Sequence, residues 1–287
     1  MIDGLPEESD ADDAHDAVHG HPRLDGSGTI NQRKFVVALA RGLKVLRAFR
    51  PGDDSLSNAE IARRTGLPKP TISRLTYTLT TLGYLGGVPE TGGYRLDPHI
   101  LSLGYPVLAK LGVRQIARPL MQRLADYSRG TVAIGIRDGL SLILVERSQD
   151  RTVVTMPLEI GSHLPIATTS MGRAYLAALP AGDRAVLMDE IRRGGPPDWW
   201  PTVRRSIDAE LARFDRCGYC VSVGDWDPDI IGVGAPLVLP DGTILAFNCG
   251  GPISRIPRER ADDIGEKLKE VVNSVAVAYR AGPPLTL

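Results

Sequence analysis

The stretch LSNAEIARRTGLPKPTISRLTYTLTTLGYL, residues 56–85, predicts two helices joined by a tight turn. Ser57 and Glu60 form a capping box, a pattern that marks where a helix begins. Gly66 supplies the turn, because glycine readily takes the left-handed backbone conformation that ends a helix. Apolar residues at helical spacing predict the buried face of the second helix: Ile72, Leu75, Leu79 and Leu82.

A further helix is expected before this pair and a β-hairpin after it. The buried face of the earlier helix is predicted from its apolar spacing: Leu39, Leu43, Leu46 and Phe49. The residues PGDDS, 51–55, then break that helix. Residues 84–97, YLGGVPETGGYRLD, are typical of two short strands around a glycine-rich tip. Together these elements predict a winged helix-turn-helix.

In a helix-turn-helix the second helix enters the major groove of double-stranded DNA, where its outer side chains reach base edges. Polar residues lie on that outer face here. Arginine reads guanine and hydroxyl groups can contact bases, which makes three residues the expected base contacts: Thr71, Ser73 and Arg74. The remaining DNA contacts, including those to phosphates, are expected from four others: Arg63, Lys69, Tyr77 and Arg95.

Charge is distributed unevenly along a chain that is neutral overall. Residues 30–98 carry eleven basic and five acidic side chains, a net charge of +6, which favours a polyanionic partner. A three-helix module that contacts another protein is the alternative. Residues 1–29 carry eight acidic residues and one Arg, and residues 1–31 predict a disordered tail, either an inert extension or a shield for the basic module.

The composition predicts a cytoplasmic protein. Of the 287 residues 43% are apolar, yet no uninterrupted apolar run is long enough to cross a membrane. The acidic N-terminus lacks the basic start and apolar centre of a signal peptide. The three cysteines cannot all pair within one chain, which suits a reducing compartment.

The remaining chain predicts a second, α+β domain. Residues 32–98 form the DNA-binding domain, 99–113 a linker helix kinked at Pro106, and 114–281 a domain with an antiparallel sheet flanked by helices. Its elements are expected in this order: a helix over 115–128; strands over 131–139, 140–148 and 152–161; helices over 180–193 and 203–218; a hairpin over 232–252; and a last helix that buries Ile264, Leu268, Val271 and Val275.

Several segments, in order, resemble IclR-type transcriptional regulators. In the first domain they are LARGLKVLRAF (39–49), residues 56–85 and GGYRLDPHILSLG (92–104). In the second they are GSHLPIATTSMGRAYLAAL (161–179), RFDRCGYCVSVGDWDPDIIGVGAPL (213–237) and DGTILAFNCGGPISRI (241–256). The resemblance implies a winged helix joined to a GAF-like effector-binding domain, homodimers or homotetramers, and control of catabolic operons.

An effector pocket is expected at the N-terminus of the helix that follows ATTS. Unpaired N–H groups and the helix dipole attract a carboxylate there, although ordinary N-capping is the alternative. The residues at this rim are Thr169, Ser170 and Met171. The family resemblance adds Leu164, Ser222, Asp225, Gly232, Asn248 and Gly250, with Gly232 opening space. Met156 and Trp226 are expected either as apolar walls of the pocket or as core residues. A small organic acid, aromatic acids included, is the expected effector.

An enzyme is the main alternative class, and its motifs are incomplete. Cys217 and Cys220 form CxxC where a helix ends, whereas a redox pair needs a helix N-terminus. With Cys249 the cysteines are one ligand short of a zinc site, and DWDPD lacks the glycine and distal glutamate of a calcium loop. No catalytic residue, metal or cofactor is therefore expected. The second alternative is a structural or partner-binding protein that uses the same two folds without effector control.

Overall fold

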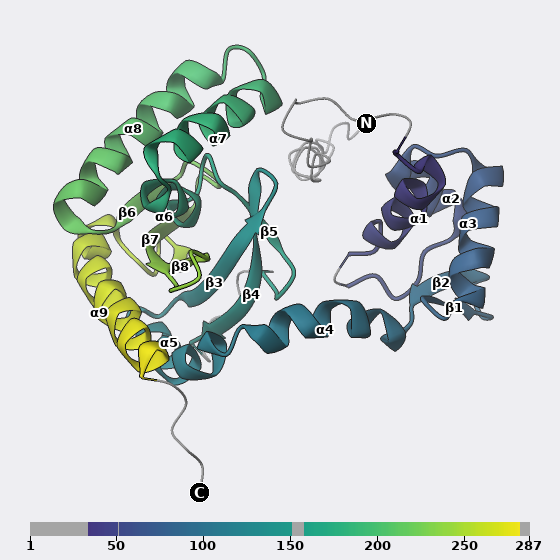
Figure 1. The fold of residues 1–287 in the computed structure, drawn as a ribbon, viewed down its shortest axis with the longest axis horizontal. Helices are drawn as coiled ribbons and strands as arrows, with labels where there is room; N and C mark the ends of the chain where they lie inside the picture. Colours follow the sequence, from purple (N-terminus) through teal and green to yellow (C-terminus); the bar gives the residue numbers. More distant parts are fainter. Residues whose placement is uncertain (1–33, 51, 151–157, 282–287) are drawn as a thin grey trace, which may run out of the picture. The chain divides into compact units, whose positions relative to one another are not determined.

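The computed structural model describes residues 34–50, 52–150 and 158–281, so the predicted tail and Met156 lie outside the described residues. The chain folds into two compact units, and the boundary between them falls between Leu111 and Gly112 in the sequence. Figure 1 shows the helices and strands of each unit.

The first unit is a winged helix-turn-helix, as predicted. Its elements are α1 (Val37–Arg47), α2 (Asn58–Thr65), α3 (Lys69–Thr81), β1 (Leu85–Val88), β2 (Gly93–Leu96), the 3-10 turn η2 (Pro98–Ile100) and α4 (Leu101–Lys110). β1 and β2 pair in antiparallel fashion and form the wing. Leu56 joins this pair at its edge, since its backbone exchanges two hydrogen bonds of 2.8 Å with Tyr94.

Half of the predicted capping box forms. Ser57 Oγ accepts a hydrogen bond from Glu60 N at 3.2 Å, and Gly66 ends α2 at a φ of 66°. The Glu60 side chain does not reach back to Ser57, because its carboxylate accepts hydrogen bonds from Arg63 and Arg64 instead. The turn between α2 and α3 therefore follows from the sequence, whereas the partners of the Glu60 side chain do not.

The core of the first unit corrects the predicted face of α1. Val45 is fully buried, whereas Leu39 and Leu43 are 63% and 51% exposed. Leu82, expected on the buried face of α3, is also exposed, and Thr76 is buried in that helix. In both helices apolar residues lie on more than one face, and the packing partner decides which face is covered. The buried apolar core consists of Val45, Leu56, Ile61, Ile72, Leu79 and Leu85.

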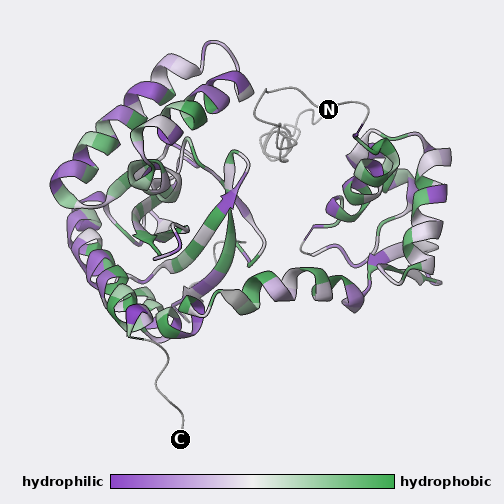
Figure 2. Cartoon of the chain, viewed as in Figure 1, coloured by the Kyte–Doolittle hydropathy of each residue, from purple (hydrophilic) through white to green (hydrophobic). Residues whose placement is uncertain are grey.

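The second unit is built on a six-stranded antiparallel sheet in the order β5-β4-β3-β8-β7-β6. The strands are β3 (Thr131–Asp138), β4 (Ser141–Gln149), β5 (His163–Pro165), β6 (Cys220–Val223), β7 (Ile230–Val238) and β8 (Ile244–Pro252). The helices are α5 (Val113–Ser128), α6 (Ser170–Ala178), α7 (Ala181–Gly194), α8 (Trp200–Cys217), the 3-10 turn η3 (Arg258–Arg260) and α9 (Ala261–Arg280). Figure 2 shows that α8 and α9 carry both hydrophilic and hydrophobic residues along their length.

Two predictions in this unit need correction. The strand expected over 152–161 falls largely outside the described residues, and its described end, 158–161, contains a turn and no strand. In α9, Val272 is buried where Val271 was expected, beside Ile264, Leu268 and Val275 as predicted. None of the described helices is long and apolar enough to cross a membrane.

Glycines in β7 let α6 pack directly on the sheet. A Cβ at Gly234 would stand 2.3 Å from the carbonyl oxygen of Ser170, and one at Gly232 would stand 2.7 Å from Ser170 Oγ. Side chains alternate between the two faces of a strand, so the side chain of Val233 points to the other face. The first turn of α6 is therefore held against the middle of β7.

Candidate functional site

The outer face of α3 carries polar side chains in the predicted arrangement. Lys69, Ser73, Arg74 and Tyr77 are exposed, and Thr71 is half-buried. The opposite face is buried through Ile72, Thr76 and Leu79. Lys69 and Arg74 add two positive charges to the exposed face.

Ser73 differs from its neighbours because its hydroxyl already has partners. Ser73 Oγ donates to the carbonyl oxygen of Lys69 at 3.2 Å and accepts from Asn58 Nδ2 at 3.3 Å. Thr76 Oγ1 donates to Asn58 Oδ1 at 3.4 Å. These contacts connect α3 to the first residue of α2, so Ser73 helps to fix the angle between the two helices.

Arginines of α2 are neutralised locally. The carboxylate of Glu60 accepts two hydrogen bonds from Arg63, at 3.0 and 2.8 Å, and one from Arg64 at 2.8 Å. These bonds, those from Arg63 above all, lower the pKa of Glu60 to about 2. Arg64 also donates to Asp53 and to the carbonyl oxygen of Ala48, which ties α2 to the segment after α1. Arg63, a predicted phosphate contact, therefore has a carboxylate at its side.

Arg95 is exposed on β2 of the wing, opposite Gly86 of β1. A Cβ at Gly86 would lie 3.6 Å from Arg95 Nε and 3.7 Å from Asp97 Oδ2, which places the Arg95 side chain beside the facing residue of β1. The wing thus adds a cation to the first unit, apart from those on α3.

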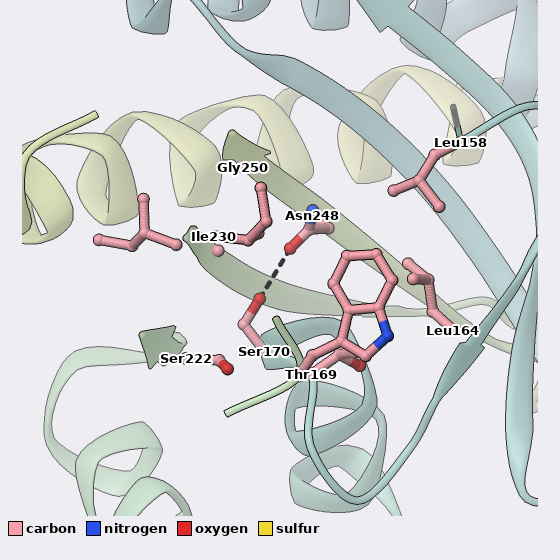
Figure 3. A pocket seen from close by; sticks show the side chains of 11 residues that line it. Leu158, Leu164, Thr169, Ser170, Ser222, Ile230, Asn248 and Gly250 are labelled. Carbon is pink, nitrogen blue, oxygen red and sulfur yellow. Dashed lines mark hydrogen bonds between the residues drawn. The ribbon is translucent and has the colours of Figure 1, made fainter. Parts of the chain in front are cut away.

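In the second unit, most of the predicted effector residues surround one cavity of about 30 Å³, shown in Figure 3. It lies between the start of α6, the strands β7 and β8, and the loop after β6. None of the described residues at its wall is charged. The predicted residues at its wall are Leu164, Thr169, Ser170, Ser222, Trp226, Gly232, Asn248 and Gly250; those missed by sequence analysis are Leu158, Ile230 and Ile231.

Polar groups of the cavity are ordered by short hydrogen bonds. Ser170 Oγ donates to Asn248 Oδ1 at 2.7 Å, the contact drawn as a dashed line in Figure 3. Asn248 Nδ2 has no hydrogen-bond partner among the described residues. Thr169 Oγ1 accepts from Gly172 N at 3.1 Å and donates to the carbonyl oxygen of Pro165 at 2.6 Å. Thr169 is therefore the N-cap of α6, and Asn248 presents N–H groups beside it.

Two predicted residues do not line the cavity. Met171 is fully buried in the core and packs towards β3, where a Cβ at Gly135 would stand 2.7 Å from its sulfur. Asp225 turns to Arg173, whose guanidinium donates to Asp225 Oδ2 at 2.7 Å. A helical N-terminus has both a wall-facing and a core-facing side, and sequence spacing alone did not separate Ser170 from Met171.

The predicted role of Gly232 also needs correction. Gly232 was expected to open space, but the volume beside its Cα is occupied by Ser170 Oγ and Asn248 Oδ1. Ile230 precedes Gly232 by two residues on the same strand, so strand alternation could have identified it. Leu158 lies outside helices and strands, and no pattern in the sequence marks it.

The cysteines are free thiols at structural positions. Cys217 is the last residue of α8, and Cys220 and Cys249 are buried in β6 and β8. Burial raises the pKa of Cys249 to about 11 and also raises that of Cys220, which keeps both thiols protonated at neutral pH.

Comparisons with known proteins match both units of the chain. The model of the IclR helix-turn-helix domain matches residues 38–89, and that of the bacterial transcriptional regulator IclR C-terminal domain matches residues 105–277. The chain is 34% identical over 266 residues to the HTH-type transcriptional regulator TsaQ1/TsaQ2 of Comamonas testosteroni, covering 91% of this chain and 94% of that one. It is 28% identical to the Pca regulon regulatory protein of Pseudomonas putida, covering 79% and 78% of the two chains.

Solved structures agree with this match. The chain is 47% identical to an IclR family transcriptional regulator from Brucella abortus, with a TM-score of 0.71 and coverage of 88% and 94%. An IclR homolog from Microbacterium hydrocarbonoxydans, solved in complex with 4-hydroxybenzoate, has the same fold at 22% identity, with a TM-score of 0.70 and coverage of 85% and 100%.

Proposed function

The chain belongs to the IclR family of DNA-binding transcriptional regulators, which are not enzymes, and from this premise we propose that a small organic acid controls its binding to operator DNA. The acid binds in the cavity between α6, β7 and β8, and the exposed face of α3 reads the operator. The observation that carries the first part is the cavity itself, where ordered neutral donors meet apolar side chains.

The DNA-binding half of the proposal rests on α3. Arg74 is exposed at a position that reaches base edges when the helix enters a major groove, and arginine pairs with guanine through two hydrogen bonds. Lys69 and Arg95 supply phosphate contacts. Ser73 acts through the angle between α2 and α3, and Thr71 and Tyr77 complete the helix surface that faces DNA.

The effector half rests on the neutral donors of the cavity. Asn248 Nδ2 offers two N–H groups, and the first turn of α6 places backbone N–H groups and the positive end of the helix dipole next to it. These donors suit the oxygen atoms of a carboxylate. Leu158, Leu164 and Trp226 suit the apolar body of an aromatic acid. The complex of the Microbacterium homolog with 4-hydroxybenzoate supports this ligand class.

The acid is a compound whose breakdown the protein regulates, and the protein acts as a homo-oligomer. A helix-turn-helix dimer binds two half-sites, so a change in the spacing of its reading helices alters operator affinity. A relative that is named for a regulon, the Pca regulon regulatory protein, supports control of a group of genes.

Isothermal titration calorimetry with benzoate, 4-hydroxybenzoate and pyruvate tests the effector half. Asn248→Ala removes the side-chain donor, and Asn273→Ala on the exposed face of α9 is the matched control. A lost hydrogen bond to a charged group is worth about 1.5–3 kcal/mol, so Asn248→Ala should weaken acid binding about tenfold or more. Equal affinity in both variants contradicts the proposed site.

Two further results separate the alternatives. If 4-hydroxybenzamide binds as tightly as 4-hydroxybenzoate, the ligand class is wrong, because the amide lacks the carboxylate charge. If the protein binds its own upstream DNA specifically and no acid alters that binding, it is a regulator without control by small acids.

A further inference from the structure

Arg173 of α6 is a buried charge with one anionic partner among the described residues. Its side chain is 2% exposed, and its guanidinium donates to Asp225 Oδ2 at 2.7 Å, while the side chain of Asp225 is 37% exposed. The other acceptors are the carbonyl oxygens of Val221 at 3.3 Å and Ala167 at 3.4 Å. A charge out of contact with water is costly unless it is paired, so this ion pair constrains the position of Asp225.

Asp225 belongs to the loop 224–229, which connects β6 to β7. Gly224 begins the loop at a φ of 74°, and its N–H donates to the carbonyl oxygen of Ile230 at 3.0 Å. Trp226 follows Asp225 directly and lines the cavity. Ser222 Oγ lies 3.4 Å from the same carboxylate oxygen that Arg173 contacts. The ion pair therefore lies one residue from the largest side chain of the cavity wall.

The cavity is too small for an organic acid as it stands. Its volume is about 30 Å³, and one water molecule needs about 10–15 Å³ of such space. β7 and α6 pack too closely to move towards each other, since a Cβ at Gly234 would stand only 2.3 Å from the carbonyl oxygen of Ser170. The loop 224–229 has four exposed residues and no helix or strand of its own. Like Leu158, it is a part of the described cavity wall that no helix or strand contains.

We infer that Asp225 is a positioning residue, which holds Trp226 across the cavity through its ion pair with Arg173. A ligand enters when this pair yields and the loop 224–229 moves outward. Because Arg173 is part of α6, the same pair connects the loop to the helix whose first turn lines the cavity. The statement about ligand entry rests on the proposed function, whereas the position of Trp226 is open to test without a ligand.

The test uses the full chain labelled with 5-fluorotryptophan and observed by fluorine NMR. Trp226→Phe assigns the Trp226 signal, and a soluble gadolinium chelate reports how far each tryptophan is exposed to solvent. The variants are Asp225→Asn, the conservative Asp225→Glu, and Arg173→Met/Asp225→Asn, which leaves no unpaired buried charge. Asp229→Asn changes the same charge at an exposed position of the same loop and is the matched control.

Relaxation of the Trp226 signal by the chelate should rise several-fold in Asp225→Asn and in the double variant, remain near the wild-type value in Asp225→Glu, and not change in Asp229→Asn. The signals of Trp199 and Trp200 should stay constant, which separates loop release from general loosening. If Asp225→Asn does not fold, the double variant decides. A Trp226 signal that is unchanged in the double variant overturns the inference.

Stopped-flow binding of 4-hydroxybenzoate forms the second part of the test. Faster association and faster dissociation in the double variant are expected when the loop is released. If the wild type binds no acid while Trp226 responds as expected, the proposed effector is wrong and the positioning role stands. If the acid binds and Trp226 does not respond, only the positioning role is wrong.

Discussion

Ser170 and Asn248 join α6 to β8 through a 2.7 Å hydrogen bond that passes directly beside the Cα of Gly232. The bond orients the Asn248 amide, because Oδ1 accepts from the hydroxyl and Nδ2 is left for the cavity. It forms only because β7 has no side chain at this position. A glycine that leaves space for a hydrogen bond, rather than for a ligand, defines the polar end of the cavity.

Gly232→Ala should break this contact. The new Cβ would stand 2.7 Å from Ser170 Oγ and 3.0 Å from Asn248 Oδ1, so the hydroxyl must rotate away. Overpacking of this kind costs about 1–3 kcal/mol, which urea denaturation measures, and the affinity for an acid should fall with it. Gly182→Ala in α7 is the control, since nothing lies within 4 Å of its Cβ. Equal stability and affinity in Gly232→Ala and wild type would show that the contact is dispensable.

Ser57→Ala should destabilise the first unit by about 1 kcal/mol, because the N–H of Glu60 loses its acceptor at the start of α2. Ser57→Asp should keep the stability of the wild type, since a carboxylate can cap the same position. Thermal denaturation followed by circular dichroism measures both. A stable Ser57→Ala protein would mean that packing of Leu56 and Ile61 alone fixes the start of α2.

Acid should lower the stability of the first unit, because the carboxylate of Glu60 becomes protonated. Hydrogen bonds from Arg63 and then Arg64 lower the pKa of its carboxyl from 4.5 to about 2. Because the pKa is lower in the folded state, the ionised carboxylate stabilises the folded state when the pH is above 4.5, the ordinary pKa of the group. This stabilisation is lost as the pH falls from 4.5 towards 2. Urea denaturation of Glu60→Gln across this range should show a smaller loss than the wild type. If the free energy of unfolding falls equally with pH in the two proteins, Glu60 is not the cause of the loss of stability in acid.

The exposed residues of α3 should fall into separate classes in DNA binding. Lys69→Ala should weaken binding to all sequences alike and reduce the dependence on salt by about one phosphate contact. Arg74→Ala should cost about 1–3 kcal/mol on the operator alone, because base contacts carry the specificity. Fluorescence anisotropy on operator and scrambled DNA at several salt concentrations measures both. Equal losses on both DNAs for Arg74→Ala would reassign it to phosphate.

The winged helix could be predicted in detail because its signals are local. Ser57, Gly66 and the glycines of the wing act on neighbouring residues, and the structure contains each of these elements. The partners of individual side chains could not be predicted in the same way. Glu60 pairs with Arg63 and Arg64 rather than with the backbone, and the orientation of α1 depends on which apolar face meets α3.

The residues of the cavity were harder to predict, because their positions depend on contacts between residues that are distant in the sequence. The segments that the family resemblance indicated meet in the structure, and eight of the predicted residues surround one cavity. Met171 and Asp225 do not line the cavity, and the space beside Gly232 is filled, because these positions depend on how α6 packs against the sheet and the loop after β6. A buried arginine in α6 gave no signal in the sequence, because arginine at that position is equally typical of an exposed helix face.

Control of DNA binding by an acid in the cavity is tested most directly by one titration. Fluorescence anisotropy of a labelled upstream DNA fragment, at fixed salt, is measured for the wild type and Asn248→Ala with and without saturating 4-hydroxybenzoate. The wild type should change its operator affinity about 5- to 150-fold, the usual range of allosteric coupling, while Asn248→Ala should respond only at higher acid concentration. Identical operator affinity with and without each acid of the calorimetric panel would contradict the proposed control.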